Sequence, residues 1–382
     1  MRSGIYSKCP LAATVLLLSV PGFVAADNAA SSTDRQGAES ATLTSSGQEP
    51  APSDREKARL RGPVEECTEE QRYGEGSWKM VYETKYGPDG RVLQRSYTNN
   101  DGTKGLYSFT YDADGHLLRA AWTGQTRTGQ TGSSDAIYNY DSEGRLTSIT
   151  GQSDWTATFQ YNDQGWKTRI VKSNLSTGDL STGVSIGLEN TDLFAVPPPG
   201  GWVTTSFNER EEAIESRIFG SDGQLLSRMT RSYDDKGRVT ESTHVIESSE
   251  ALVSPTTREH LRPDSEVSEK LEAAIAQFLG PGRLFVRNSY VYDGQGRVSE
   301  THQDVGTSGH TITKISYNDH GDEAQHVGTT SRAAHGPEES VVNVSYQYDS
   351  FDNWTEKITS SASTANEPPK TWTIEHRTIT YY

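Results

Sequence analysis

Hydrophobic and polar positions alternate with a period of two along most of the chain from about residue 73 onward. The hydrophobic positions are often aromatic, as in Tyr107, Phe109 and Tyr111 or in Tyr290 and Tyr292. A period of two is typical of a strand with one buried face and one face in water. Short segments rich in Asp, Asn and Gly separate these runs, so the pattern predicts a series of antiparallel β-hairpins.

The predicted turns share a repeated motif, in which an aromatic residue stands four positions before a glycine. Eight units follow this rule: Tyr86/Gly90, Tyr111/Gly115, Tyr140/Gly144, Tyr161/Gly165, Phe219/Gly223, Tyr233/Gly237, Tyr292/Gly296 and Tyr317/Gly321. A ninth begins at Tyr348, and there we expect Asn353 to replace the glycine, because Asn tolerates the left-handed region. Asp or Asn commonly follows the aromatic residue, where it can accept hydrogen bonds from the turn backbone, and glycine supplies the positive φ.

The complete motif reads Tyr-Asp-x-x-Gly-Arg-Val/Leu, as at Tyr140–Leu146 and Tyr292–Val298. It resembles the YD repeat of the Rhs family, and the resemblance covers about residues 73–382 with gaps. It implies strand–turn–strand units wound into large β-sheet shells, which enclose a toxin or mediate contacts at cell surfaces. It also implies carbohydrate binding. The chain has neither a recognisable Rhs core nor a recognisable C-terminal toxin domain, so we do not expect toxin delivery.

We therefore expect an all-β fold made of repeated antiparallel hairpins. A flat sheet of about 18 strands, spaced by about 4.8 Å, would be roughly 85 Å wide. Twisted sheets of more than about ten strands tend to curl or fold over. The prediction is a curled or barrel-like sheet with its aromatic face inward.

Two insertions interrupt the repeats, at about residues 173–203 and 245–288. The first is rich in Ser, Thr and Gly and predicts a surface loop. The second predicts one short α-helix at about 265–279, with Val267, Leu271, Ala274, Ile275, Phe278 and Leu279 on one face. This helix either covers an open edge or mouth of the sheet, or acts as a gate or partner-docking helix.

Residues 1–26 have the features of a Sec-type signal peptide. Arg2 and Lys8 precede the apolar run Leu11–Val20, and the small residues of Val24–Ala26 fit a cleavage site. The run is too short to span a membrane, although an N-terminal anchor is the alternative. We expect an exported protein that is periplasmic, on the cell surface or extracellular, with no transmembrane anchor after signal removal.

Residues 27–62 are rich in Ser, Ala and Thr and predict a disordered tether, which leaves 63–382 as the YD-repeat β-sheet domain. If the signal is removed, Cys9 leaves with it and Cys67 is the single remaining cysteine. One thiol cannot form an internal disulfide. Cys67 is then either a small buried hydrophobic residue or a thiol for intermolecular pairing.

The formal net charge of the whole chain is −16, and hydrophobic residues make up only 32% of it. Such an acidic chain is not expected to bind nucleic acid or anionic membrane surfaces. The low hydrophobic content also disfavours two conventional sealed cores.

Candidate catalytic chemistry is sparse. Gly183–Gly187 matches the nucleophile-elbow pattern around Ser185, but its Ser/Thr/Gly-rich surroundings favour a chance match over a strand-to-helix turn. We predict no catalytic and no cofactor-binding residues, and no cofactor, and we do not expect an enzyme.

Candidate metal ligands are equally few. His320 and His326 flank Asp322 and Glu323, but strand alternation does not bring their side chains together. The pairs Asp112/Asp114 and Asp234/Asp235 could offer oxygens to calcium, and ordinary turn chemistry accounts for them as well. We predict no metal site.

The aromatic residues allow two interpretations. They include seven tryptophans: Trp78, Trp122, Trp155, Trp166, Trp202, Trp354 and Trp372. Their placement fits packing between neighbouring hairpins, and aromatic rings on a sheet can also stack on sugar rings.

The leading functional hypothesis is a non-enzymatic exported scaffold that binds a cell-surface glycan or an envelope protein. One alternative is a small hydrolase hosted in the curled sheet, with Ser185 or His320 as candidate residues. A second is an outer-membrane β-barrel, which the run Val239–His244 disfavours because it offers no uncharged apolar face.

Overall fold

The computed structural model describes residues 53–74, 78–151, 156–173, 200–248, 251, 266–332, 335–362 and 368–382. Within them, twenty strands form one antiparallel sheet, and each strand pairs with its neighbours in the sequence. The strands are β1 (Val64–Tyr73), β2 (Trp78–Tyr86), β3 (Val92–Asn99), β4 (Lys104–Tyr111), β5 (Leu117–Gln125), β6 (Thr131–Tyr140), β7 (Leu146–Gly151), β8 (Thr156–Tyr161), β9 (Lys167–Ser173), β10 (Trp202–Phe207), β11 (Ala213–Phe219), β12 (Leu225–Tyr233), β13 (Val239–Ile246), β14 (Leu284–Tyr292), β15 (Val298–Val305), β16 (Gly309–Tyr317), β17 (Glu323–Arg332), β18 (His335–Tyr348), β19 (Trp354–Ala362) and β20 (Lys370–Tyr381).

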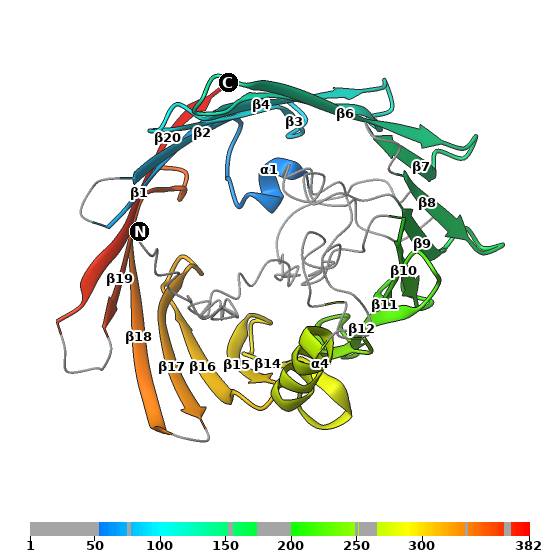
Figure 1. The fold of residues 1–382 in the computed structure, drawn as a ribbon. Helices are drawn as coiled ribbons and strands as arrows, with labels where there is room; N and C mark the ends of the chain where they lie inside the picture. Colours follow the sequence, from blue (N-terminus) through cyan, green and yellow to red (C-terminus); the bar gives the residue numbers. More distant parts are fainter. Residues whose placement is uncertain are drawn as a thin grey trace, which may run out of the picture.

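The sheet closes on itself. β1 pairs with β2 on one side and with β20 on the other, so the strands form a complete ring (Figure 1). The all-β prediction is confirmed, and the curled or barrel-like sheet is a closed barrel. It has twenty strands rather than about eighteen, because β1 and β20 lie outside the repeated turns and pair with each other.

Nine turns of the repeat type lie at one rim of the barrel, between β2 and β3, β4 and β5, and so on to β18 and β19; we call this the YD rim. The predicted Phe219/Gly223 unit also forms a hairpin turn, but it joins β11 to β12 at the opposite rim. The missed unit is Phe207–Glu211. Glu211 takes the glycine position there with φ of 57°, so the aromatic-to-glycine spacing did not reveal it.

The turn chemistry is the one expected from the sequence. In a representative unit, the Gly144 N–H donates to the Asp141 carbonyl over 3.1 Å, and Gly144 has φ of 78°. Asp141 Oδ1 accepts from the backbone N–H groups of Glu143 and Arg145, both at 2.9 Å. The ninth unit needs a correction, because Asp352 and not Asn353 adopts the left-handed conformation, with φ of 62°.

Each turn of the YD rim is followed by a β-bulge at the same place. In the Tyr140 unit, Asn139 pairs with Ser148 but Tyr140 pairs with Leu146, which leaves Thr147 as the extra residue. The Thr147 hydroxyl donates to the Asn139 carbonyl over 3.0 Å. The same shift follows the turns after β2, β4, β8, β10, β12, β14, β16 and β18. Bulges bend a strand and raise its twist, so this series favours closure of the sheet.

One helix identifies the inner face of the barrel. Seen along the barrel axis, α1 (Asp54–Lys57) lies inside the ring of strands (Figure 1). The residues after it form a buried cluster with Cys67 and Tyr86, which therefore face inward. Because side chains alternate along a strand and partners in register share a face, the inner face of the other strands follows from their pairing.

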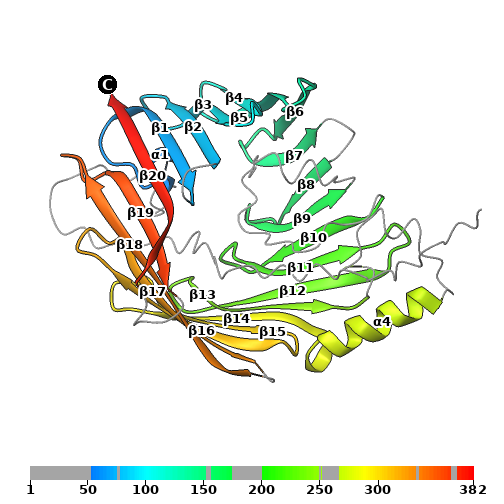
Figure 2. The same cartoon turned by 60° about the vertical axis from the view of Figure 1, so that its left-hand side comes forward.

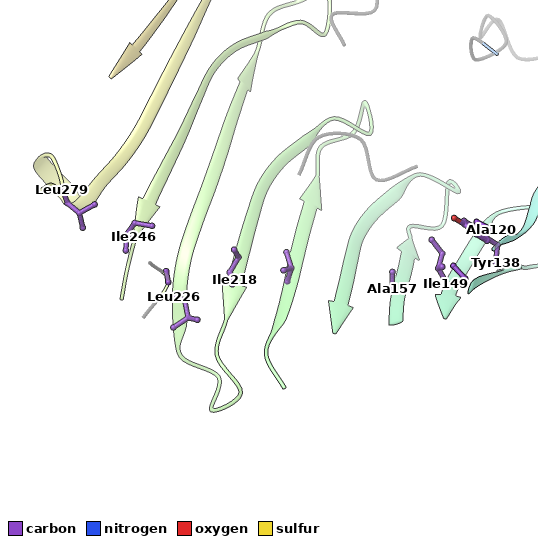
Figure 3. Packing of buried hydrophobic residues seen from close by; sticks show 11 residues of the cluster. Ala120, Tyr138, Ile149, Ala157, Ile218, Leu226, Ile246 and Leu279 are labelled. Atoms are coloured by element: carbon purple, nitrogen blue, oxygen red, sulfur yellow. The ribbon is translucent and has the colours of Figure 1, made fainter. Parts of the chain in front are cut away.

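The larger hydrophobic cluster is a band across the strand ends. Figure 3 shows it running from Leu279 through Ile246, Leu226 and Ile218 to Ile149 and Tyr138. The predicted helix is present as α4 (Glu266–Phe278), beside β14 and β15 (Figure 2). Ile275 and Phe278 pack against this band, and Leu279 belongs to it. The side chains of Val267, Leu271 and Ala274 lie outside those that are described.

The first described segment begins inside the predicted tether. Ser53 caps α1 through a capping box with Glu56, and Leu60 is only 5% exposed. Local capping and one apolar side chain thus order the residues just before β1. The predicted signal peptide, the tether up to residue 52 and the loop insertion at 174–199 lie outside the described residues. No helix in the described ranges is long and apolar enough to cross a membrane.

Candidate functional site

The inner faces of β1 to β5 and β18 to β20 carry a continuous patch of aromatic and charged side chains, which we call the polar wall. Its aromatic members on β1 to β5 are Tyr73, Trp78, Tyr82, Tyr97, Tyr107 and Trp122. Cross-strand pairing places them on one face, since Tyr73 pairs with Trp78, Tyr82 with Tyr97, and Tyr107 with Trp122.

Trp122 lies over a hollow made by three glycines. A Cβ atom on Gly124 would approach the indole to 2.2 Å, and one on Gly105 would meet its Nε1 atom at 2.8 Å. A Cβ on Gly132, on the next strand, would lie 3.4 Å away. The indole therefore lies along the wall across β4, β5 and β6, and at Gly105 and Gly124 only glycine leaves room for it.

Tyrosines extend this aromatic surface. The Tyr97 ring also packs on Gly105, and its centroid is 6.4 Å from that of Tyr107. Burial raises the pKa of Tyr107 to about 12, so its hydroxyl stays protonated and able to donate. The Arg95 guanidinium lies 5.2 Å from the centre of the Tyr82 ring. This part of the wall thus presents flat rings with one cation beside them.

An ion-paired row continues the wall across β1 and β20. The Arg377 Nε atom donates to Glu69 Oε2 over 3.0 Å, and the Arg377 guanidinium lies 3.5 Å from the centre of the Trp354 ring. Gln71 donates to Glu69 over 2.7 Å and accepts from the Tyr73 hydroxyl over 3.0 Å. Carboxylate, guanidinium and amide groups of this row therefore lie next to the rings of Tyr73 and Trp354.

A second ion pair extends the row to β19. Lys357 Nζ lies 2.9 Å from Glu375 Oε1, and Glu375 is also reached by Gln71 Nε2 at 3.4 Å. Both carboxylates of the row, Glu69 and Glu375, therefore have cationic partners. Their oxygens are suited to accept hydrogen bonds from a polar ligand and so to orient it.

The histidines weighed as metal ligands do not converge. His326 Nε2 lies 3.0 Å from Glu323, whereas the His320 ring stacks on Tyr348 at 3.9 Å in the rim turn. Asp322 accepts from the Tyr348 hydroxyl over 2.7 Å. The pair at Asp234/Asp235 also serves the turn, because Asp234 accepts from the Arg238 guanidinium over 2.7 Å.

One group in the described part of the chain has ligand atoms close enough for a metal ion, namely Asp112, Asp114 and His116, within 4.8 Å of one another. It includes one of the pairs considered in the sequence. His116 occupies the position that Arg takes in other units, and its Nδ1 atom lies 2.9 Å from Asp112 Oδ2. The contact repeats the Asp–Arg pairing of the neighbouring turns, so turn chemistry accounts for the group.

Sequence reasoning found the aromatic residues but missed the charged row. Glu69 and Arg377 lie at opposite ends of the chain, and they meet because β1 pairs with β20. A signal was present in β1, whose alternate positions are polar on both faces, but it does not name the partner strand. Ser185 and Trp155, which the sequence analysis considered, lie outside the described residues.

Comparison with solved structures gives weak likenesses. A porin-like protein from Bacteroides uniformis is 10% identical with a TM-score of 0.33, over 84% of this chain and 99% of that one. The Photorhabdus luminescens Tc holotoxin pore is 12% identical with a TM-score of 0.30, over 79% of this chain and 13% of that one. The TcdB2–TccC3–Cdc42 complex is 13% identical with a TM-score of 0.26, over 76% and 15%. TM-scores of this size carry no argument about function.

The family comparison is more specific. No curated protein matches the chain significantly. Residues 140–177 match the family model described as RHS Repeat, and this stretch begins at a complete Tyr-Asp-x-x-Gly-Arg unit. The resemblance seen in the sequence is thereby confirmed over this stretch of the chain.

Proposed function

We propose that the protein is an exported, non-enzymatic binding scaffold that takes up a carbohydrate chain against the polar wall. The observation that carries this proposal is the indole of Trp122, which lies along the wall over Gly105, Gly124 and Gly132. A ring held in this way offers a flat apolar face to a sugar ring. The neighbouring ion-paired row supplies donors and acceptors for sugar hydroxyls.

The outer face supports a barrel that stands in water. It carries ion pairs between neighbouring strands, such as Lys79 with Glu70 at 2.5 Å and Arg119 with Asp135 at 2.9 Å. Arg287 similarly lies 3.2 Å from Glu241. Charged side chains at this density destabilise a surface that faces lipid.

The proposal is tested by titrating the purified protein with a panel of neutral and acidic oligosaccharides in a calorimeter. Trp122→Ala is expected to weaken binding about tenfold or more, because the stacking surface is lost. Trp166→Ala is the matched control, since Trp166 is 42% exposed and lies in a turn of the YD rim. Failure of every oligosaccharide to bind, or equal affinity of the Trp122 and Trp166 variants, would overturn the proposal.

An outer-membrane barrel is the second candidate, and one observation favours it. The ring is closed, antiparallel and even-numbered, with twenty strands, as bacterial outer-membrane barrels are. The two candidates differ in where the protein fractionates. The scaffold stays in the aqueous phase when cells are broken without detergent, whereas a membrane barrel sediments with the envelope and is released by detergent.

A further inference from the structure

The pairing of β1 with β20 is the one strand contact of the ring that no turn or insertion supports. It runs from Val64 opposite Tyr381 to Tyr73 opposite Thr373. All other neighbouring strands are consecutive in the sequence, so the chain itself holds their ends together. We call the β1–β20 contact the seam. It must be held by contacts alone.

Residues 53–62 cross the seam at the YD rim, and their first part is fixed to the turn between β2 and β3. The Arg55 N–H donates to the Gly90 carbonyl over 3.0 Å, and Asp54 Oδ2 accepts from the Val92 N–H over 3.0 Å. Ser53 lies close to Gly90: a Cβ atom added to Gly90 would lie 2.9 Å from the Cβ atom of Ser53. Helix α1 is therefore seated directly on this turn.

The last part of the segment is fixed to the turn between β18 and β19, on the other side of the seam. The Arg61 N–H donates to Asn353 Oδ1 over 2.6 Å, and Asn353 Nδ2 donates back to the Arg61 carbonyl over 2.8 Å. The Arg61 guanidinium lies 3.2 Å from Asp352. Asn353 thus pairs with the backbone of Arg61 much as a strand partner would.

Asn353 also holds the end of β20. Its Nδ2 atom donates to the Tyr381 hydroxyl over 2.8 Å, and that hydroxyl contacts Asp349 as well. The Tyr382 N–H donates to the Pro63 carbonyl over 3.0 Å. The end of β20 and the segment that leads into β1 are consequently tied to one asparagine at this rim.

Beneath the segment lies a small closed core. Leu60, Val64, Cys67 and Tyr86 are each no more than 7% exposed, and Ala58 packs against them. Since Leu60 belongs to the segment and Cys67 to β1, departure of the segment would uncover Cys67.

We propose that residues 53–62 are a clasp that holds the seam closed, and that the barrel opens between β1 and β20 when the clasp leaves. The clasp takes the place that a turn occupies between other strands, but it can detach without breaking the chain. The inference is independent of which ligand the polar wall binds.

Two readouts test the clasp in the full chain carrying Cys9→Ser. Thiol labelling under native conditions reports access to Cys67, and hydrogen exchange of the β1 and β20 amides reports separation of the seam. Asn353→Ala is expected to speed both by roughly tenfold, because it removes the hydrogen bonds that join the segment and the end of β20 to the β18–β19 turn. Arg145→Ala, at the same repeat position in the turn between β6 and β7, is expected to change neither.

Equal rates in the two variants would mean that the seam does not depend on the clasp. Faster labelling of Cys67 without faster exchange in β1 and β20 would make the segment a cover and not a clasp. If Asn353→Ala fails to fold, Asp54→Ala removes only the carboxylate that accepts from Val92, and the same two rates decide the question.

Discussion

The Tyr292 hydroxyl donates a hydrogen bond to the Val239 carbonyl over 2.7 Å, and the Arg238 guanidinium lies 4.3 Å from the centre of the same ring. Tyr292 belongs to one unit of the YD rim, and Val239 and Arg238 belong to the unit before it. The same hydroxyl-to-carbonyl bond recurs as Tyr111 to Val92, Tyr140 to Leu117, Tyr161 to Leu146, Tyr233 to Ala213 and Tyr317 to Val298. Six of the nine units are thus braced against the unit before them around the rim.

Removing one of these hydroxyls should destabilise the barrel. Tyr292→Phe leaves the Val239 carbonyl without its donor while keeping the ring under Arg238, so we expect a loss of about 1 kcal/mol in the free energy of unfolding. Denaturant titration measures it. Tyr107→Phe is the control, and a loss of equal size there would mean that the hydroxyl of Tyr292 has no special role.

The Phe207 unit offers the reverse experiment. Phe207 has no hydroxyl. Lys167 stands where the other units have the residue whose carbonyl accepts the hydrogen bond, and its Nζ atom lies 4.7 Å from the centre of the Phe207 ring. Phe207→Tyr is therefore expected to add the missing bond and stabilise the protein by about 0.5–1.5 kcal/mol. A variant that unfolds at the same or a lower denaturant concentration would contradict the bracing rule.

Glycine is needed at one position of the turn and not at its neighbour. Gly296 has φ of 82°, so Gly296→Ala should cost roughly 1–2 kcal/mol. Gly294, in the same turn, has nothing within 4 Å of an added Cβ, and Gly294→Ala should be neutral or slightly stabilising. Thermal unfolding of the two variants provides the comparison, and equal losses would refute the conformational explanation.

The turn aspartates should make the barrel sensitive to acid. The guanidinium and backbone N–H of Arg238 hold the pKa of Asp234 below its ordinary value, and the backbone N–H and guanidinium of Arg145 do the same for Asp141. Because folding lowers the pKa of these carboxyl groups, they stabilise the folded state fully at pH values above their pKa in the unfolded chain, about 3.9. This stabilisation is lost as the pH falls through their pKa in the folded protein. The melting temperature is therefore expected to drop below about pH 4.

Substitution checks this assignment. Asp234→Asn should flatten the acid-side fall of the melting temperature, because the variant has one fewer carboxylate to protonate. Asp235→Asn is the control in the same turn, since Asp235 takes part through its carbonyl, which accepts from Arg210 at 3.1 Å. Identical acid profiles of wild type and Asp234→Asn would remove the assignment.

One buried cation should make stability rise toward alkaline pH. Lys172 is 4% exposed, and burial lowers its pKa to about 8 from an ordinary value of 10.5. Folding then disfavours the charged form, so stability increases as the pH rises from about 8 toward 10.5. Lys172→Met is expected to be more stable than wild type at pH 7 and to lose this rise, as measured by denaturant titration at several pH values.

Local chemistry was predictable from the sequence, and long-range pairing was not. The turns, the period-two strands and α4 follow from residue type and spacing over a few positions. The Phe219/Gly223 spacing predicted a turn but could not show that this turn lies at the opposite rim. The Phe207 unit was missed because Glu211 replaces glycine. The meeting of Glu69 with Arg377 depends on β1 pairing with β20, and no local pattern specifies that register.

Because the strands follow one another in up-and-down order, the diameter of the barrel depends on the number of hairpins. A ring built from consecutive hairpins lengthens its circumference by about 10 Å for each hairpin added, since neighbouring strands lie about 4.8 Å apart. Duplication or loss of one Tyr-Asp-x-x-Gly-Arg unit would therefore widen or narrow the lumen without altering any other turn. The exception is the pair β1 and β20, which closes the ring. These two strands and residues 53–62, which bridge them, would have to be kept whatever the number of repeats.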